Sequence, residues 1–384
     1  MEAYFDNSAS TRVLDGVRDI VVKTMTEDYG NAAAKHRKGV EAERYIREAR
    51  AVIADTLKVQ EKEILFTSGG SESNNMALIG TALANPRLGK HIISTAIEHP
   101  SVYNPLAYLE SLGYEITFLQ VDENGHIRLE ELQAAIRPDT VLVSVMYVNN
   151  EIGAVEPIEE ISRIVREANP KTIFHVDAIQ AYGKFRIRPK KQGIDLLSVS
   201  GHKIHAPKGV GFLYIRDGVK VKPLFYGGGQ QDGMRSGTEN VPGTAGLGVA
   251  AREMYEHFDE HVRRITELKD YMTDRLGELT DVKINSKKGA ESAPQIVSVS
   301  FGGVRSEVLL HALEDKGIYV SSGSACSSHH PGVSGSLKGI GLPPKYLDGT
   351  IRISFGVFNT KEEVDYCIDT LKELLPVLRR YKRG

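Results

Sequence analysis

The chain has 384 residues, which is enough for two domains or for one large domain with an appendage. Lys and Arg number 48 and Asp and Glu number 50, so the formal net charge of −2 provides no bulk positive field and disfavours a nucleic-acid-binding protein. Hydrophobic residues at 41% and charged residues at 26% exclude a largely disordered chain, and two cysteines are too few for a disulfide scaffold or a Cys-rich zinc site.

Residues 1–11 show neither the basic segment nor the apolar core of a signal peptide. No window of the sequence approaches the roughly 18 apolar residues that a membrane span requires. The low cysteine content fits a reducing compartment. We therefore expect a cytoplasmic protein that uses no membrane segment and makes no direct contact with nucleic acid.

Short β-rich runs alternate with helical patterns along the first part of the chain. We expect strands at residues 63–67, 91–95, 114–121, 141–148 and 172–176. Helices are expected between them, at residues 72–83, 101–112, 129–136 and 158–167. This alternation predicts an α/β structure with a mainly parallel sheet flanked by helices, whose active site lies at the carboxyl ends of the strands.

The composition changes after about Gly243, where a long, charge-rich helical stretch leaves the first domain. In the second unit we expect strands at residues 296–301 and 350–355, helices at 306–316 and 361–381, and a Ser/Gly-rich loop at 321–339. The pattern predicts a large α/β domain over residues 13–255. A smaller α+β domain is expected from residues 1–12 and 256–384.

A junction rich in Gly and Ser, at residues 67–74, connects an expected strand to an expected helix. Free backbone N–H groups and the helix dipole at such a junction can hold a phosphate. Neither the Walker Gly-Lys-Ser/Thr pattern nor G-x-G-x-x-G is present, so nucleotide and NAD binding lose their usual support. On its own, the stretch is explained equally well as a helix cap and turn.

Two more junctions carry reactive side chains at expected strand ends. Asp177 ends an apolar run and Gln180 lies three residues later, so an acid and an amide can both face a heteroaromatic ring. Lys203 follows another apolar run. Taken singly, such an Asp is usually a helix cap and such a Lys is usually solvated. Together, a Schiff-base lysine, a carboxylate for a pyridinium nitrogen and a phosphate site are what pyridoxal phosphate requires.

Ordered motifs occur along nearly the whole chain. They are Phe-Asp-Asn-Ser-Ala-Ser-Thr at 5–11, Ser-Gly-Gly-Ser-Glu-Ser-Asn at 68–74, Glu-His at 98–99, Val-Asn-Asn-Glu-Ile-Gly at 148–153, His-Val-Asp-Ala at 175–178, Ser-Gly-His-Lys at 200–203, Met-Arg-Ser-Gly-Thr at 234–238, Ser-Ser-Gly-Ser-Ala-Cys at 321–326 and Ile-Arg-Ile-Ser-Phe at 351–355. In this set the chain resembles cysteine desulfurases of the NifS/IscS type, which are class V aminotransferases among the fold type I pyridoxal-phosphate enzymes. The resemblance implies the large domain and the smaller α+β C-terminal domain expected above, with the catalytic cysteine on the loop 321–339.

The resemblance also implies a role for each site residue. Lys203 would carry pyridoxal 5'-phosphate, Asp177 would pair with its pyridine nitrogen, and His99 would stack on its ring as a catalytic group. The other cofactor contacts are expected from Gly70, Ser71, Asn150, Gln180, Ser200, His202 and, reaching across a homodimer, Thr238. No metal is expected.

Cys326 lies on the Ser/Gly-rich loop, where a thiol can be exposed and mobile, whereas Cys367 lies in a helical run typical of a structural cysteine. The resemblance implies that Cys326 takes the sulfur of L-cysteine as a persulfide while L-alanine is released. Arg352 and Asn150 would bind the substrate, Arg352 through the carboxylate. The persulfide sulfur would pass to an acceptor protein, for an iron–sulfur cluster or for thiolation of tRNA or a thiocofactor.

Two alternatives stay open at this point. A selenocysteine lyase or a related pyridoxal-phosphate-dependent lyase would use the same Lys203, Asp177 and Cys326. A catalytically silent docking partner for sulfur carriers is disfavoured because the set of expected catalytic residues is complete.

Overall fold

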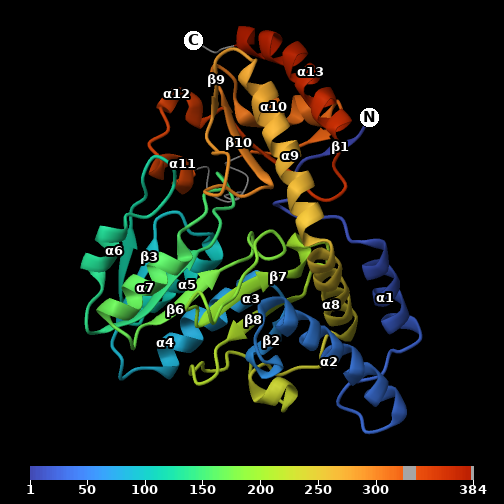
Figure 1. The fold of residues 1–384 in the computed structure, drawn as a ribbon, viewed down its shortest axis with the longest axis vertical. Helices are drawn as coiled ribbons and strands as arrows, with labels where there is room; N and C mark the ends of the chain where they lie inside the picture. The colour runs from blue at the N-terminus through green and yellow to red at the C-terminus, as the bar shows by residue number, and fades with distance from the viewer. Residues whose placement is uncertain (323–333, 382–384) are drawn as a thin grey trace.

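The computed structural model describes residues 1–322 and 334–381, which fold into two layered units with separate hydrophobic cores. Figure 1 shows the larger unit in the lower part of the view, where helices surround an extended sheet. The smaller unit, which contains both ends of the chain, lies above it. None of the helices in the described ranges combines the length and the hydropathy that a membrane crossing requires.

A seven-stranded sheet forms the centre of the larger unit. Its strands are β2 (Ile64–Thr67), β3 (His91–Thr95), β4 (Glu115–Leu119), β5 (Thr140–Met146), β6 (Ile173–Asp177), β7 (Leu196–Ser200) and β8 (Gly211–Ile215), in the spatial order β2-β8-β7-β6-β5-β3-β4. The ladders from β4 through β3, β5 and β6 to β7 are parallel, which confirms the expected mainly parallel sheet. Strand β8, which the sequence did not lead us to expect, runs antiparallel to both of its neighbours.

Helices cover both faces of this sheet, which explains why β5 and β6 are buried at every residue and read as continuous apolar runs. The helices packed on one face are α1 (Asp15–Thr26), α2 (Arg37–Leu57), α6 (Leu129–Ala135), α7 (Ile158–Ala168) and α8 (Val241–Glu256). Those on the other face are α3 (Gly70–Asn75), α4 (Thr81–Ala84) and α5 (Pro100–Ser111). A π-helical turn at Met76–Gly80 joins α3 to α4, so the expected helix over 72–83 is continuous.

The smaller unit has a four-stranded antiparallel sheet of order β12-β13-β10-β9 and a short parallel pair of β1 with β11. Its strands are β1 (Ala3–Tyr4), β9 (Val282–Ile284), β10 (Ile296–Phe301), β11 (Ile318–Tyr319), β12 (Ser321–Ser322) and β13 (Thr350–Ser354). Its helices are α9 (Phe258–Gly277), α10 (Ser306–Glu314), α11 (Gly335–Gly339), α12 (Pro344–Leu347) and α13 (Lys361–Leu378). Cys367 is fully buried in α13, as expected, and burial raises its pKa to about 12.

Two expectations for this part of the chain were wrong. The helical stretch after Gly243 is not one helix, because α8 and α9 meet at His257, where the chain passes from the core of the larger unit to that of the smaller. The Ser/Gly-rich loop is shorter than 321–339 at both ends. Ser321 and Ser322 pair with β13, and the Ser334 hydroxyl accepts a hydrogen bond from Leu337 N as the cap of α11. Both contacts depend on tertiary packing or capping that composition alone does not reveal.

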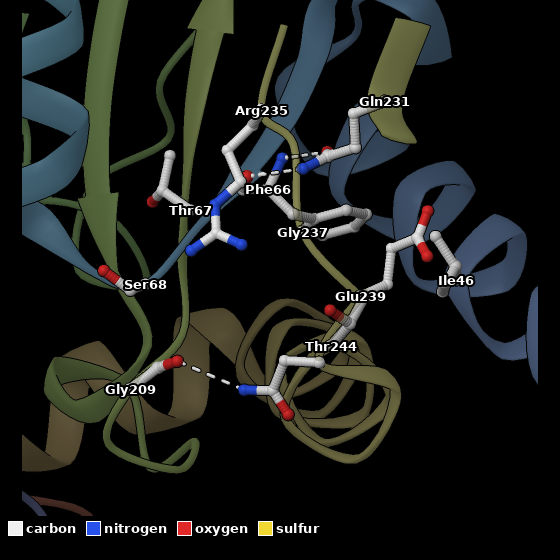
Figure 2. A pocket seen from close by; sticks show the side chains of 11 residues that line it. Ile46, Phe66, Thr67, Ser68, Gly209, Gln231, Arg235, Gly237, Glu239 and Thr244 are labelled. Carbon is white, nitrogen blue, oxygen red and sulfur yellow. Dashed lines mark hydrogen bonds between the residues drawn. The ribbon is translucent and has the colours of Figure 1, made fainter. Parts of the chain in front are cut away.

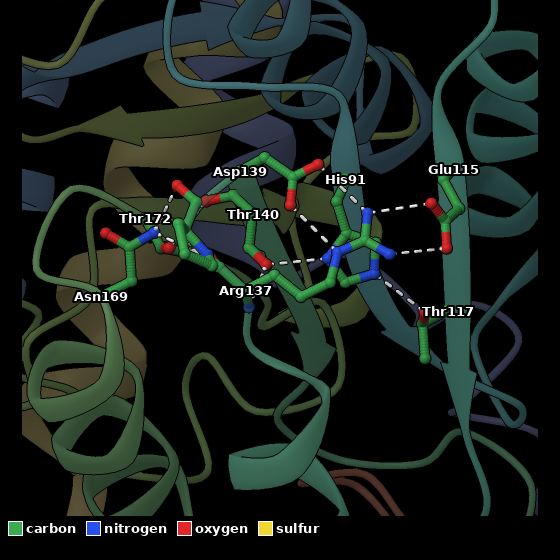
Figure 3. A network of polar contacts seen from close by, with 9 residues as sticks. His91, Glu115, Thr117, Arg137, Asp139, Thr140, Asn169 and Thr172 are labelled. Carbon is green, nitrogen blue, oxygen red and sulfur yellow. Dashed lines mark hydrogen bonds and ion pairs between the residues drawn. The ribbon is translucent and has the colours of Figure 1, made fainter.

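The amino-terminal ends of the central strands are tied together by a polar network (Figure 3). His91 at the start of β3 lies 2.7 Å from Thr140 Oγ1 and 2.8 Å from Thr117 Oγ1. Nearby, Arg137 makes a bidentate ion pair with Glu115, with Nη1–Oε1 at 2.7 Å and Nη2–Oε2 at 2.9 Å. Because this network closes the amino-terminal edge of the sheet, the opposite edge, at the carboxyl ends of the strands, is left for a site.

Candidate active site

A cavity of about 450 Å³ lies at the carboxyl ends of β5, β6 and β7 and is also lined by the smaller unit. The expected site residues that line it are Gly70, Ser71, His99, Asn150, Asp177, Gln180, Ser200, His202, Lys203 and Arg352. Residues more than 280 positions apart in the sequence are thus brought to one cavity, as the difference between Gly70 and Arg352 shows (352 − 70 = 282). Cys326 lies outside the described residues, so its role stays a prediction.

Lys203 stands on a short 3-10 turn, Gly201–Lys203, directly after β7. The turn is tight because Gly201 N donates to Val210 O at 2.9 Å, and a Cβ on Gly201 would lie only 3.0 Å from that oxygen. The Lys203 amine donates to the main-chain carbonyls of Ser8, at 2.5 Å, and Ala9, at 2.8 Å. The amino-terminal arm therefore holds the lysine amine at the edge of the cavity.

Asp177, the last residue of β6, is 5% exposed. Its Oδ1 accepts from Ile179 N at 3.0 Å, and its Oδ2 accepts from Asn74 Nδ2 at 2.8 Å. Burial raises the pKa of the Asp177 carboxyl, and these hydrogen bonds, together with the electrostatic interactions with His99 and Lys203, oppose that shift. A protonated ring nitrogen bound in the cavity would supply a further counter-charge, so this carboxyl suits a pyridinium partner.

His99 caps the amino terminus of α5 through its ring. Its Nδ1 accepts from Ser101 N at 3.1 Å and lies 2.8 Å from Ser101 Oγ. Because the backbone N–H can only donate, the neutral ring carries its proton on Nε2, which is the nitrogen available to a ligand in the cavity. Burial lowers the pKa of His99, which favours this neutral form.

Two residues that link these groups were missed in the sequence. Asn74 is fully buried on α3, and its Nδ2 donates both to Asp177 and, at 2.9 Å, to Ser101 Oγ. Through Ser101 the chain of contacts reaches His99. The available signal was the amide itself, because Asn is a poor helix former and a buried Asn inside a helix needs polar partners.

The start of α3 forms a cradle with room for a phosphate group. Gly69 has φ +146°, a conformation that L side chains rarely adopt, and a Cβ on Gly70 would lie 2.2 Å from Ile179 Cδ1. Gly70, Ser71, Ser200 and His202 also line a second, more open cavity of about 400 Å³ beside Lys208. Burial, together with the positive charges of Lys203, Lys208 and Lys184, lowers the pKa of His202 to about 4. Lys203 and Lys208 thus place positive charge beside the cradle, which fits a bound phosphate.

Arg352 in β13 is 6% exposed and comes from the smaller unit. Its Nη2 lies 2.8 Å from Asp6 Oδ1, and its Nη1 donates to the main-chain carbonyl of Asn150, also at 2.8 Å. The third nitrogen, Nε, is buried and has no hydrogen-bond partner among the described residues. A buried N–H without an acceptor is costly, so a carboxylate entering the cavity would find a donor already positioned.

The two described ends of the segment that contains Cys326 are attached close to this arginine. Ser321 in β12 is the ladder partner of Arg352. On the other side, the Ser334 hydroxyl donates to Glu151, and Asn149 Nδ2 donates to Ser336 Oγ at 3.0 Å. The segment thus leaves and re-enters the fold beside the cavity.

Thr238 is an expected cofactor contact that does not line this cavity. It is exposed on the segment that crosses the outer edge of β2, between two residues labelled in Figure 2, Gly237 and Glu239. This segment is anchored by Arg235, which pairs with Glu72 of α3 at 3.0 Å, and by Gln231, whose amide bonds both main-chain polar groups of Phe66. Within one chain, therefore, Thr238 is not brought together with the other expected residues.

Comparison with known proteins identifies similar chains along the full length. A profile described as Aminotransferase class-V matches residues 3–367. Cysteine desulfurase IscS of Dictyoglomus turgidum is 41% identical over 379 residues, covering 98% of this chain and 95% of that relative. Cysteine desulfurase IscS of Methanosarcina thermophila is 43% identical over 376 residues, covering 98% and 92%.

Solved structures give the same result for the fold. A NifS-like protein superposes with a TM-score of 0.93 at 39% identity, covering 98% of this chain and 100% of that one. The structure titled SspA in complex with cysteine has a TM-score of 0.80 at 35% identity, covering 93% and 100%. The two-unit architecture is thus shared with these proteins at the level of the fold.

Proposed function

The chain belongs to the class-V aminotransferase family, and from this we propose that it is a pyridoxal-phosphate-dependent cysteine desulfurase that leaves the sulfur of L-cysteine on Cys326. The observation that carries the proposal is the convergence of Lys203, Asp177, His99 and Arg352 on one cavity. An amine, a buried carboxyl, a neutral imidazole and a guanidinium are the groups that an amino-acid substrate and a pyridine cofactor need.

The residues present fit the cofactor. Lys203 would hold it covalently, Asp177 would face its pyridine nitrogen, and His99 would lie against its ring. Gly70, Ser71, Ser200 and His202 would surround its phosphate, while Asn150 and Gln180 would lie near its phenolic oxygen. When bound, pyridoxal 5'-phosphate supplies the electron sink for the pair released as the substrate Cα loses its proton.

This chain's own residues would bind and orient the amino acid. Arg352 would take the substrate carboxylate through the N–H groups that do not contact Asp6 and Asn150, among them the unpaired Nε. The Lys203 amine would accept the Cα proton, and the Ser8 and Ala9 carbonyls would hold the amine within reach. His99 would keep a donatable proton on Nε2, because Ser101 N occupies Nδ1.

The sulfur step would be carried by Cys326. Its thiolate would attack the substrate sulfur, so that an S–S bond forms as the substrate Cβ–S bond breaks, and Cβ would finally be protonated to give L-alanine. L-Cysteine and the Cys326 thiol thus become L-alanine and a Cys326 persulfide, which balances without another reactant. The attachment of the Cys326 segment beside Arg352 supports this assignment.

We also propose a homodimer in which Thr238 contacts the phosphate bound by the neighbouring subunit. Support comes from the exposure of Thr238 and from large apolar side chains exposed on α1 and α2, among them Val22, Met25 and Val40. A cytoplasmic location and a sulfur-acceptor protein that takes the persulfide are further parts of the proposal. Sedimentation of the purified protein should give twice the monomer mass.

The deciding experiment is a titration of the cofactor-loaded enzyme with L-cysteine, followed by visible absorbance, alanine release and peptide mass spectrometry. We expect a spectral change, one alanine per sulfur transferred, and a mass gain of one sulfur on the Cys326 peptide. Cys326→Ala should keep the visible band and lose the persulfide. A visible band that responds to selenocysteine but not to cysteine would favour the selenocysteine lyase instead.

A further inference from the structure

Lys184 is a buried lysine that the proposed mechanism does not use. It follows β6 by one short turn and is 8% exposed. Its Nζ donates a 2.5 Å hydrogen bond to the main-chain carbonyl of Lys203. In the described part of the chain, no carboxylate lies within 4.0 Å of this amine. Lysines are almost never buried without a counter-charge, so a specific contact must offset the cost of burial.

The contact is made to a turn that needs support from several sides. His205, two residues after Lys203, has φ +65°, which is unusual for a residue other than Gly. On one side of the turn, Thr11 donates to His202 O from both N and Oγ1, at 3.0 Å each, and accepts from His205 N. On the other side, Lys184 holds the carbonyl of Lys203 itself.

We propose that Lys184 is a positioning residue for the desulfurase reaction: its amine fixes the backbone of Lys203 and so sets where the Lys203 side chain meets the cofactor and the substrate Cα. This inference rests on the role proposed for Lys203. A lysine that is held only through its side chain could swing when that side chain changes partner during turnover. A clamp on its carbonyl keeps the start of the side chain fixed throughout.

The groups that face Lys184 are themselves basic. Burial, together with the charge of Lys203, lowers the pKa of Lys184 to about 7. Burial also lowers the pKa of His202 and His205, and the charge of Lys184 adds to both shifts. Burial lowers the pKa of His205 to about 4, and the ring is held in place by Nδ1, which lies 2.7 Å from Arg12 O, and by an edge-to-face contact with Phe358. Around this turn, therefore, the side chains of Lys184 and His205 are held by main-chain carbonyl oxygens and not by carboxylates.

The test compares Lys184→Met, which keeps length but has no donor, with Lys184→Gln, which keeps an N–H donor. Lys171→Met, at an exposed lysine, is the matched control. Readouts are kcat and KM for L-cysteine, the melting temperature, and the visible circular dichroism of the bound cofactor, which reports its orientation. Lys184→Leu replaces the methionine variant in the same comparison if that protein does not fold.

We expect the methionine variant to lose about 10- to 100-fold in kcat, because a small displacement of a reacting group has effects of this size. Its KM should stay within about twofold, and its visible dichroism should fall. The glutamine variant should recover to within about threefold of the parent kcat. Equal loss in the methionine and glutamine variants, or a lowered melting temperature with unchanged kcat and dichroism, would overturn the proposal.

A separate measurement keeps this result apart from the proposed function. Borohydride reduction of the cofactor-loaded parent enzyme, followed by peptide mapping, shows which lysine carries the cofactor. Label on Lys203 with no effect of Lys184→Met rejects the positioning role alone. Label on another lysine rejects the function proposed for Lys203, and with it the basis of the inference.

Discussion

Asn74 Nδ2 donates a 2.8 Å hydrogen bond to Oδ2 of Asp177, so a side chain of α3 fixes the carboxylate at the end of β6. The same amide donates to Ser101 Oγ at 2.9 Å, and Ser101 in turn holds His99. The group proposed to lie at the cofactor nitrogen and the group proposed to lie on its ring are therefore positioned by one buried amide.

The first prediction concerns this amide. Asn74→Ala removes the donor that helps to keep the pKa of Asp177 down, so the carboxyl becomes a weaker partner for a ring cation. We expect kcat to fall about tenfold, in line with the loss of one buried hydrogen bond to a charged group. Steady-state assays with L-cysteine measure this, and Asn169→Ala, an amide in the remote network of Figure 3, is the control. Equal loss in the two variants would contradict the prediction.

Residues with local signals were predictable, and residues defined by distant partners were not. Asp177 and Lys203 were predicted because each lies at the end of an apolar strand, whereas His99, Asn150 and Arg352 entered only through the resemblance. Asn74 was missed because its partners Ser101 and Asp177 lie 27 and 103 positions away.

The same reason separates the correct from the incorrect parts of the fold. Strands β3, β5 and β6 are buried at every residue and contain Ile or Val, as a parallel sheet covered on both faces requires. The residues of β8 are also apolar, but nothing in Gly211–Ile215 itself indicates that the strand turns back between β7 and β2. The antiparallel direction of β8 is decided by its pairing with β7 and with β2, which is distant in the sequence.

A second prediction concerns Gly70. A Cβ at this position would lie 2.2 Å from Ile179 Cδ1, so Gly70→Ala must displace either the start of α3 or the side chain of Ile179. Overpacking of this kind costs about 1–3 kcal/mol, and we expect pyridoxal 5'-phosphate to bind about tenfold more weakly. Titration of the cofactor-free protein by visible absorbance gives the affinity. Gly277→Ala, where a Cβ would meet nothing within 4 Å, should bind like the parent.

A third prediction concerns the buried guanidinium. Arg352→Lys keeps a positive charge but loses Nε and the fork that contacts Asp6 and Asn150 together. We expect kcat/KM for L-cysteine to fall about 10- to 100-fold, mostly through KM, because charged hydrogen bonds contribute about 1.5–3 kcal/mol. The visible band of the bound cofactor should stay unchanged. Loss of the cofactor itself would show that Arg352 supports the cofactor site and not the substrate carboxylate. Arg305→Lys, at an exposed arginine, controls for the substitution.

The last prediction concerns His175, which is fully buried in the centre of the sheet between Ser144 Oγ at 2.8 Å and Ser198 Oγ at 2.9 Å. Burial lowers its pKa to about 3, against about 6.5 in the unfolded chain. Below pH 6.5 the unfolded chain takes up a proton that the folded protein refuses, so the free energy of unfolding should fall by about 1 kcal/mol per pH unit for this group, down to about pH 3.

Urea unfolding at pH 7, 6 and 5 measures the slope, which His91, His202 and His205 also steepen because burial lowers their pKa values as well. His175→Asn keeps a polar side chain but cannot titrate. Its free energy of unfolding should therefore fall less steeply with decreasing pH than that of the parent, by the contribution of this one histidine. Parallel slopes for the parent and His175→Asn would contradict the prediction. They would mean that the imidazole takes up a proton inside the folded sheet, with both ring N–H groups donating to the two serine hydroxyls.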